Sequence, residues 1–335
     1  MNNNTVAVMG AYGHTATFVI AQLRELGLVP IPVGRDRARL VALGPASRVA
    51  SADDPAALDR AFAEVAAVVN CAGPFADTAV PVAEAAIRAG AHYVDVAAEQ
   101  AVTMDLLSRF DGPVRAAGVA VVPSAAFYGG LGDLLATAAM GDWPAADDIQ
   151  VAIALDSWLP TEGTRRTIAR NSGRHVVFAD NRFVSAPTTP TTVTWRFASS
   201  VGEQRLTDLP TADQVTIAHH LRTPRINVHM NTQPLDDLRD PTSPPPAPAD
   251  DLGRSAQTFQ VDVEVTRGGE RRRASATGQD IYAVSGPLAA AAVARLLDRK
   301  PVGALPSGEL FDANELLHSL APLHLSWTTT VHERV

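Results

Sequence analysis

Lysine and cysteine are almost absent from this chain of 335 residues, since Lys300 is its only lysine and Cys71 its only cysteine. A single cysteine cannot form an intrachain disulfide, and nothing has the cysteine spacing of a metal site. Any mechanism that needs a lysine must use Lys300. The Tyr-x-x-x-Lys mechanism of the short-chain dehydrogenases is therefore excluded, because no tyrosine lies four residues before Lys300.

Long basic runs and long apolar runs are also missing. The longest basic run is 271–273 and the net charge is −8, so nucleic acid is not an expected partner. No stretch of about 18 apolar residues suggests a membrane span. The first residues, MNNNTVAVMG, lack the basic region and apolar core of a signal peptide. These absences predict a cytoplasmic protein that binds neither nucleic acid nor membrane.

The first 133 residues alternate between two kinds of apolar pattern. Buried-strand patterns occur at 5–9, 28–33, near 49, 66–70, 92–96 and 119–123, and helical patterns lie between them. Strands that alternate with helices at this spacing predict a parallel sheet wound by right-handed crossovers.

Strand-like runs dominate after Asp133. A helix is predicted at 134–140, and strand patterns follow at 149–156, 175–184, 191–197, 225–231 and 259–278, the last with a hairpin signal at Gly268-Gly269. We predict a second, α+β domain over 134–280 with a largely antiparallel sheet, in which 234–253 is an exposed Pro- and Asp-rich loop. The alanine-rich helix at 285–298 resembles the first part in composition. Residues 281–335 are therefore predicted to return to residues 1–133, so that the C-terminal helices complete the first domain.

Two glycines three residues apart, Gly10 and Gly13, separate the first predicted strand from a helical pattern. In a dinucleotide cradle the first glycine allows a tight turn and the second lets the backbone approach the pyrophosphate. The helix N-terminus then presents free N–H groups. Ala16 stands where a third glycine often occurs, and an ordinary βα turn is the alternative interpretation. The residues predicted to bind a dinucleotide here are Gly10, Tyr12, Gly13, His14 and Thr15.

A basic residue, Arg35, follows the second predicted strand. An acid in this place would bind a ribose 2′-hydroxyl and repel a 2′-phosphate, whereas arginine pairs with phosphate and stacks on adenine. Arg35 therefore predicts NADP(H), with Arg37 and Arg39 as additional candidates. Asp36, also at the cofactor site, would favour NAD if it faced the ribose, but we favour its interpretation as a helix N-cap.

The segment Asn70-Cys71-Ala72-Gly73-Pro74 ends the fourth predicted strand. Ligands of such sheets lie at the carboxyl ends of the strands, so Asn70, Ala72, Gly73 and Pro74 are expected near the nicotinamide. Cys71 is predicted to be a small buried hydrophobic group rather than a nucleophile.

Several of these segments together resemble the saccharopine dehydrogenase-like reductases. They are GAYGHTATFVIAQL, GRDRARL, VVNCAGPF, AGAHYVDVAAEQ and, near the end, DIYAVSGPLAAAAVARLL and PSGELFDANELL. The resemblance implies a Rossmann domain joined to an α+β substrate and dimerisation domain, and hence a homodimer. It also implies NADPH-dependent reduction of an imine formed from an amine and a carbonyl. Because the family includes an enoyl reductase, the resemblance indicates cofactor and hydride transfer better than substrate.

The segment PSAAFYGGLGDLLA lies where the family has a glycine-rich loop that ends in an aspartate and a helix. Asp133 matches that aspartate and is thereby implied in substrate binding. Tyr128 and Gly129 stand in place of the usual acid and proline, so the resemblance does not define the substrate of this chain.

Hydride transfer places negative charge on a substrate, so a proton donor and an anion clamp are useful. The donor candidates are Tyr128, which we prefer, Glu99 and Asp95, all just past predicted strand ends. A packed aromatic ring and a helix-capping Glu99 are the structural alternatives. Arg166 and Arg170 share a helix face and could hold a substrate carboxylate, or simply face solvent.

No metal site is predicted, because the spacing of His219, His220 and His229 does not force ligands to converge. We predict an NADPH-dependent oxidoreductase that transfers a hydride to an imine or carbonyl of a small metabolite. The alternatives are an enoyl reductase and a non-catalytic NADPH-binding sensor or interaction protein, since a cradle implies binding and not turnover. The second domain favours an enzyme, because clefts between domains commonly hold substrates.

Overall fold

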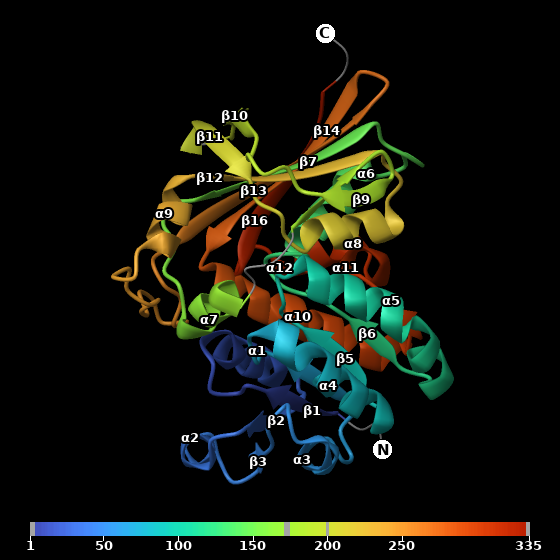
Figure 1. Cartoon of the computed structure of the whole chain (residues 1–335), viewed down its shortest axis with the longest axis vertical. Coiled ribbons are helices and arrows are strands. Elements are labelled where there is room, and N and C mark those ends of the chain that lie inside the picture. Colours follow the sequence, from blue (N-terminus) through green and yellow to red (C-terminus); the bar gives the residue numbers. More distant parts are fainter. Residues whose placement is uncertain (1–3, 171–174, 199–200, 333–335) are drawn as a thin grey trace.

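Two β-sheets, one above the other in Figure 1, organise the chain. The computed structural model describes residues 4–170, 175–198 and 201–332. The first sheet is parallel, with seven strands in the order β15-β6-β5-β4-β1-β2-β3. Their bounds are β1 Thr5–Met9, β2 Val29–Gly34, β3 Arg48–Val49, β4 Ala67–Asn70, β5 His92–Asp95, β6 Ala120–Val122 and β15 Gly303–Ala304. The order of β1 to β6 is that of a dinucleotide-binding Rossmann fold, so the predicted class of this domain is confirmed.

Helices cover both faces of the first sheet. One face carries α1 (His14–Glu25) and α10 (Ile281–Arg299), and the other carries α3 (Pro55–Ala61), α4 (Phe75–Arg88) and α5 (Gln100–Ala117). The strands are apolar on both faces and therefore need helices on both sides. Val6 and Val8 pack toward α1 and α10, and Ala7 and Met9 pack toward the helices on the opposite face. A short helix, α2 (Arg37–Val41), follows β2.

Helix α10 has an apolar composition that its position explains. Within the described residues it is the one helix long and apolar enough to cross a membrane, but 67% of its apolar window is buried inside the protein. A Cβ atom on Gly286 would lie 2.7 Å from Cβ of Phe18, so α1 and α10 approach closely at this glycine. The apolar residues of α10 therefore serve the core of the first domain.

The second sheet has nine strands and is mixed but mainly antiparallel, as predicted for the second domain. The path is β10-β11-β12-β7-β13-β14-β16, β8 and β9 extend from β12, and only the β7–β12 pair is parallel among the described strands. The bounds are β7 Asp148–Leu155, β8 Val176–Ala179, β9 Arg182–Ser185, β10 Thr192–Arg196, β11 Glu203–Asp208, β12 Arg225–Asn231, β13 Thr258–Arg267, β14 Glu270–Gln279 and β16 Leu325–His332. The predicted hairpin at Gly268-Gly269 is confirmed.

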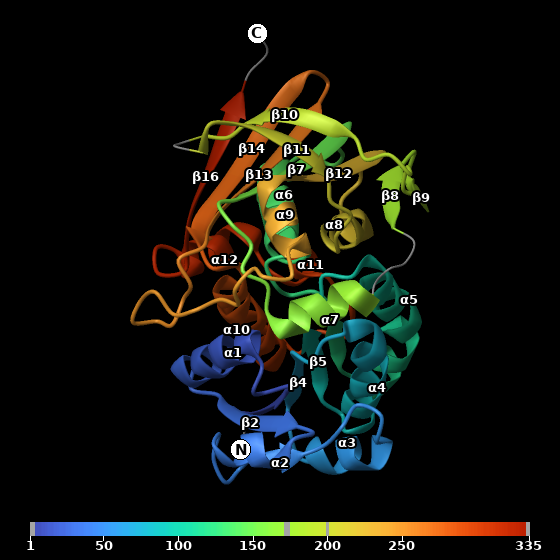
Figure 2. The same ribbon diagram turned by 60° about the vertical axis from the view of Figure 1, so that its left-hand side comes forward.

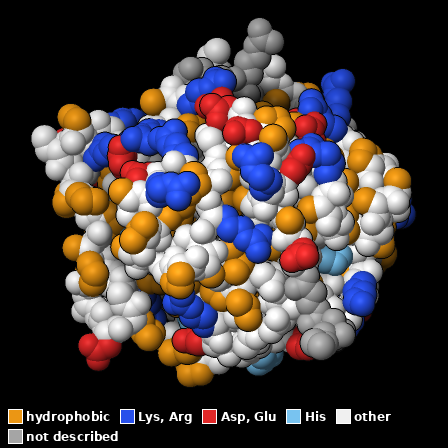
Figure 3. Space-filling view, turned by 90° about the horizontal axis from the view of Figure 1, so that it is seen from below, with side chains coloured by type: hydrophobic (Ala, Val, Ile, Leu, Met, Phe, Trp, Pro, Cys, Tyr) orange, Lys and Arg blue, Asp and Glu red, His pale blue; other side chains and the backbone are white. Residues whose placement is uncertain are grey.

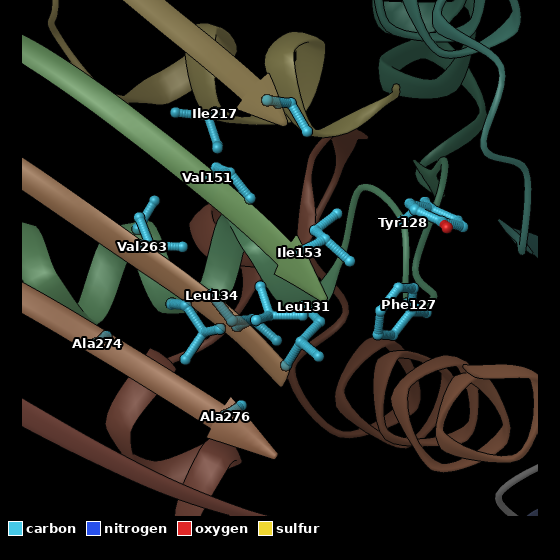
Figure 4. Packing of buried hydrophobic residues seen from close by; sticks show 14 of the residues in the cluster. Phe127, Tyr128, Leu131, Leu134, Val151, Ile153, Ile217, Val263, Ala274 and Ala276 are labelled. Atoms are coloured by element: carbon cyan, nitrogen blue, oxygen red, sulfur yellow. The ribbon is translucent and has the colours of Figure 1, made fainter. Parts of the chain in front are cut away.

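The largest apolar cluster lies against one face of this second sheet. Leu131 and Leu134 of α6 (Leu131–Met140) pack against Val151, Ile153 and Val263, as Figure 4 shows. Helices α8 (Asp213–His220) and α12 (Ala313–Leu320) also pack on this face of the sheet. Figure 2 shows α6, α8 and α12 between the two sheets.

The C-terminal segment departs from the sequence-based prediction. Helix α10 and strand β15 return to the first domain, but α12 and β16 belong to the second, where β16 pairs with β14 over Leu325–His332. The prediction that all of 281–335 completes the first domain is therefore wrong for its last part. The alternating pattern of Leu325, Trp327 and Thr329 suits an edge strand, and only the distant β14 offers the missing partner.

The segment predicted as an exposed loop, 234–253, begins inside a helix. Helix α9 (Gln233–Arg239) uses Pro234 in its first turn, where a missing N–H has no consequence. The remaining residues, 240–253, form an irregular and mostly exposed loop. Two further helices, α7 (Glu162–Arg170) and α11 (Ser307–Leu310), lie near the boundary between the domains.

Candidate functional site

The glycine turn after β1 has the geometry of a phosphate cradle. Gly10 has φ +77°, and a Cβ atom there would lie within 3.0 Å of backbone atoms of Ala72. Gly13 is the N-cap of α1, and no side chain caps the first turn of that helix. The N–H groups of that turn lack intrahelical partners, and Tyr12, Gly13, His14 and Thr15 are all partly exposed there. A pyrophosphate therefore fits at this point, where the backbone offers both space and donors.

The end of β2 carries the groups that suit a 2′-phosphate. Arg35 is exposed at this end. The pKa of Asp53 is lowered by a hydrogen bond with Ser51, and the charge of Arg35 contributes to the shift. Arg39 lies 4.2 Å from the Tyr12 ring centroid and donates to the carbonyl of Tyr12 at 3.2 Å. Figure 3 shows basic and acidic side chains interspersed on this end of the molecule, so phosphate recognition must come from individual arginines.

Asp36 caps helix α2, as we favoured from the sequence. Its carboxylate accepts a hydrogen bond from the backbone N–H of Arg39 at 3.1 Å, and its backbone is extended. The carboxylate is thereby directed to the helix N-terminus, where it also complements the helix dipole. Asp36 would favour NAD only if its carboxylate faced the ribose, and here the carboxylate caps α2 instead.

Replacement of Arg35 by alanine tests the cofactor preference. We expect NADPH to bind at least tenfold more tightly than NADH to the native protein. The Arg35→Ala variant should lose about 1.5–3 kcal/mol for NADPH, the contribution of a hydrogen bond to a charged group, and little for NADH. Fluorescence titration of both cofactors measures this, with Arg24→Ala at the far end of α1 as the matched control. Equal affinities of the native protein for the two cofactors would contradict the assignment.

The β4–α4 loop is shaped by Asn70. Its Oδ1 accepts from the N–H of Ala72 at 3.0 Å, and its Nδ2 donates to Tyr93 Oη at 3.2 Å. The loop thus brings Ala72 against Gly10. Burial raises the pKa of the Cys71 thiol, which keeps it protonated and agrees with its predicted role as a small hydrophobic group.

Two of the three predicted proton donors are fully engaged by the protein. Asp95 is inaccessible and accepts hydrogen bonds from Tyr93 Oη and from the N–H groups of Ala97 and Ser124. Burial raises its pKa to about 6. The hydrogen bonds from Ala97 and Ser124 show that Asp95 shapes the turns after β5 and β6.

Glu99 has a comparable structural role at the start of α5. Burial raises its pKa, and its carboxylate accepts from the N–H groups of Phe75 and Ala98. It occupies the N-cap position of α5 but makes no side-chain cap bond. Glu99 thereby connects the loop after β5 to the first residue of α4.

Tyr128, the preferred donor, differs from both. Its side chain is 9% exposed, and its hydroxyl is buried without a hydrogen-bond partner among the described residues. The ring contacts Phe127 edge to face and stacks on Trp158 at 5.9 Å between centroids. Figure 4 shows the hydroxyl directed away from the labelled aliphatic side chains. A buried hydroxyl without a protein partner points to a ligand partner.

Asp133 is buried and bonded to other groups of the protein. It is inaccessible, its Oδ1 lies 2.6 Å from Nε2 of His220, and its Oδ2 accepts from the N–H of Gly308 at 2.6 Å. Burial opposes protonation of His220, but the Asp133 carboxylate outweighs burial and raises the pKa of the imidazole. The predicted substrate-binding role is therefore corrected to that of a buried link between α6, α8 and α11.

The two arginines predicted to hold a carboxylate are each paired with an acid of the chain. Arg166 pairs with Glu162 on the same helix, and Arg170 Nη2 lies 2.9 Å from Oδ1 of Asp77 on α4. All four side chains are exposed. The predicted clamp is therefore not formed, and α7 instead crosses to the first domain, where Thr167 lies against Gly73.

Sequence reasoning missed the aromatic group that joins the domains. Tyr282, at the start of α10, accepts from Trp158 Nε1 at 3.2 Å and from the N–H of Thr161 at 3.4 Å. Its hydroxyl also lies 2.9 Å from Oγ1 of Thr164. Trp158 stacks on Tyr128, so this group lies next to the unpartnered hydroxyl. The available signal was Asp280 before an apolar helical run, an N-cap signature that puts Tyr282 at a helix start.

His14 and Asp280 meet beside this group. The Asp280 carboxylate caps α10 through the N–H groups of Tyr282 and Ala283 and accepts from the N–H of Ser255. Nε2 of His14 lies 3.9 Å from Oδ2 of Asp280. His14, the first residue of α1, is thus adjacent to Asp280, where the chain re-enters the first domain.

The three histidines considered as metal ligands are separate. His220 faces Asp133, His219 lies 3.8 Å from Glu309, and His229 lies on β12 beside Asp208. Within the described residues, no group of three or more His, Cys, Asp or Glu side chains could hold a metal ion.

Comparison with known proteins agrees with this geometry. Residues 6–122 match the family model of the saccharopine dehydrogenase NADP binding domain. No curated protein sequence matches the chain. The fold is similar to that of apo saccharopine dehydrogenase (L-Glu forming) from Saccharomyces cerevisiae, with a TM-score of 0.67, 14% identity and coverage of 98% of this chain and 100% of that one. An engineered D-amino acid dehydrogenase bound to NADP+ gives a TM-score of 0.50, 14% identity and coverage of 95% and 98%.

The cradle and the family model together define an NADP-dependent oxidoreductase. Residues 6–122 therefore carry the NADP binding domain of the saccharopine dehydrogenase family that the sequence segments resemble. The solved structures, at these low identities, add agreement of fold.

Proposed function

We propose that this oxidoreductase is an NADPH-dependent reductase that acts on the C=N or C=O group of a small metabolite, with Tyr128 as the proton donor. The observation that carries the proposal is the buried Tyr128 hydroxyl, which has no hydrogen-bond partner among the described residues. It lies on the loop after β6, at the carboxyl edge of the first sheet, where ligands of such sheets bind.

The surroundings of Tyr128 suit a neutral donor. Burial raises the pKa of Tyr128 well above its usual value, so the phenol remains protonated at neutral pH. NADPH held at Gly10, Gly13 and Arg35 would supply the hydride, and the nitrogen or oxygen of the reduced double bond would then need a proton. Tyr128 then donates its proton to that atom, while Phe127 and Trp158 exclude water from the hydroxyl.

A substrate screen tests the proposal. Imines, keto acids and enoyl compounds are offered with NADPH, and cofactor oxidation is followed by absorbance. We expect turnover with members of the first two classes. Turnover of enoyl compounds alone would contradict the proposed bond type, and tight NADPH binding without oxidation by any class would favour the sensor.

We further propose that the protein is a homodimer that pairs through the second sheet. Among the described strands, β16 bonds to β14 alone, which leaves its outer backbone groups for another partner. Sedimentation at micromolar concentration should give twice the mass of one chain. A monomer under these conditions would contradict the pairing.

A further inference from the structure

A small cavity in the second domain lies apart from the cofactor cradle. Its volume is about 210 Å³, it is partly open to solvent, and it is lined by residues of β7, β8, β10, β11, β12 and α8 and of the adjoining loops. Figure 2 shows these strands in the upper part of the molecule, remote from the β1–β2 region. The walls are formed by Gln150, Val177, Pro187, Thr191, Val193, Asp208, Pro210, Gln214, Asn227, Val228 and His229.

The tautomer of His229 follows from its neighbours. Gln150 Nε2 donates to Oδ2 of Asp148 at 2.5 Å, and this bond fixes the orientation of the amide. Gln150 Oε1 therefore faces Nε2 of His229, at 3.2 Å, and can only accept. Nε2 of His229 must carry the hydrogen.

The other ring nitrogen of His229 faces an acceptor. Nδ1 lies 3.1 Å from Oδ1 of Asp208 but makes no hydrogen bond, and the residue is 4% exposed. Burial lowers the pKa of His229, against the opposing effect of the Asp208 and Asp148 carboxylates. In the neutral imidazole, a bare nitrogen lone pair therefore faces a carboxylate oxygen. The buried nitrogen and the partly exposed carboxylate oxygen are both acceptors, so a donor placed between them would bond to both.

We propose that this cavity is a binding site for a small aliphatic ammonium compound, whose N–H groups donate to Asp208 Oδ1 and His229 Nδ1. The positive charge complements Asp208, which also accepts from the N–H of Thr191 at 2.6 Å. Val177, Val193 and Val228 offer apolar surface for a short carbon chain.

Other occupants fit less well. An anion would be repelled by Asp208, and a divalent metal ion would find one imidazole and one carboxylate where it needs more ligands. Water molecules would satisfy the two acceptors but would gain nothing from the apolar side chains Val177, Val193 and Val228, which a short carbon chain would cover. An amine with a short chain meets both the polar and the apolar walls.

The cavity is also connected to the first domain. Gln214, one of its walls, accepts from Nε2 of Gln100 at 2.5 Å, and Gln100 lies at the start of α5. Gln100 further bonds both backbone groups of Val176 on β8. An occupant of the cavity thus sits one hydrogen bond away from a contact between the domains.

Binding of n-propylammonium, followed by NMR on the full chain, tests the site. We expect saturable shifts of the His229 ring resonances, and none with n-propanol, which has the same chain length and no charge. Asp208→Asn keeps an acceptor for Thr191 and should weaken binding tenfold or more, and His229→Gln should do the same. The matched control is Glu270→Gln, which neutralises an exposed acid at the tip of the β13–β14 hairpin and should leave binding unchanged.

Two results would overturn the proposal even if a variant failed to fold. The first is a ligand-free native protein whose His229 ring spectrum is that of an imidazolium, because an ion pair with Asp208 would then satisfy the site internally. The second is a native protein that binds n-propanol as well as n-propylammonium, or neither, which leaves water as the occupant. None of these readouts depends on the oxidoreductase activity.

Discussion

Replacement of Tyr128 by phenylalanine should lower turnover by about 10²–10⁴-fold, the usual contribution of a positioned general acid. NADPH affinity should not change, because Tyr128 lies beyond the cradle. The variant should be as stable as the native protein, since the lost hydroxyl has no hydrogen-bond partner among the described residues and its removal relieves desolvation. Turnover is measured with a substrate from the screen, and stability by thermal unfolding.

Tyr93→Phe is the matched control for this prediction. It also removes a buried phenolic hydroxyl, but one bonded to Asn70 and Asp95. Tyr93→Phe should therefore lower the melting temperature, with a far smaller effect on turnover than Tyr128→Phe. Native turnover from Tyr128→Phe would move the donor role to Glu99 or Asp95, despite their engaged carboxylates.

Gly13→Val should abolish measurable binding of both NADPH and NADH. A Cβ atom at this position already lies 3.1 Å from the carbonyl oxygen of Gly10, and the branched methyl groups would occupy the space of the pyrophosphate. Loss of two hydrogen bonds to a charged group costs about 3–6 kcal/mol, which is at least a hundredfold in affinity. Fluorescence titration measures the loss.

The matched control is Gly112→Val on α5, an exposed glycine with open space around it and an ordinary helical φ. This variant should bind both cofactors normally. Circular dichroism establishes whether Gly13→Val keeps its fold. A folded Gly13→Val protein with native NADPH affinity would reduce the two glycines to an ordinary turn.

The parts of the molecule that could be predicted from sequence are those whose signals are local. The first sheet and its helices follow from apolar spacing, and the cap role of Asp36 follows from its position before the first turn of α2. The dinucleotide cradle was predicted from the apolar spacing of β1 and α1 together with the positions of Gly10 and Gly13 between them. Each of these judgements depends on residues within a few positions of one another.

Two of the corrected predictions concern groups whose partners are distant in the chain. Asp133 meets Gly308, 175 positions away, and Arg170 meets Asp77, 93 positions away. Sequence spacing identifies a charged side chain but not the group that neutralises it. Strand β16 was missed for the same reason, because an exposed edge strand has only a weak pattern of its own.

The position of β16 has a consequence for the order in which a growing chain can fold. The second sheet acquires its edge strand from residues 325–332, and the first sheet acquires α10 and β15 only after strands β7 to β14 of the second sheet have been made. During translation, β6 therefore lacks its outer neighbour until residues 303–304 are made, and β14 is an open edge until residues 325–332 are made. The first sheet is not complete when its N-terminal strands have been made, so a nascent chain must keep these sheet edges from pairing with other chains until the later segments are present.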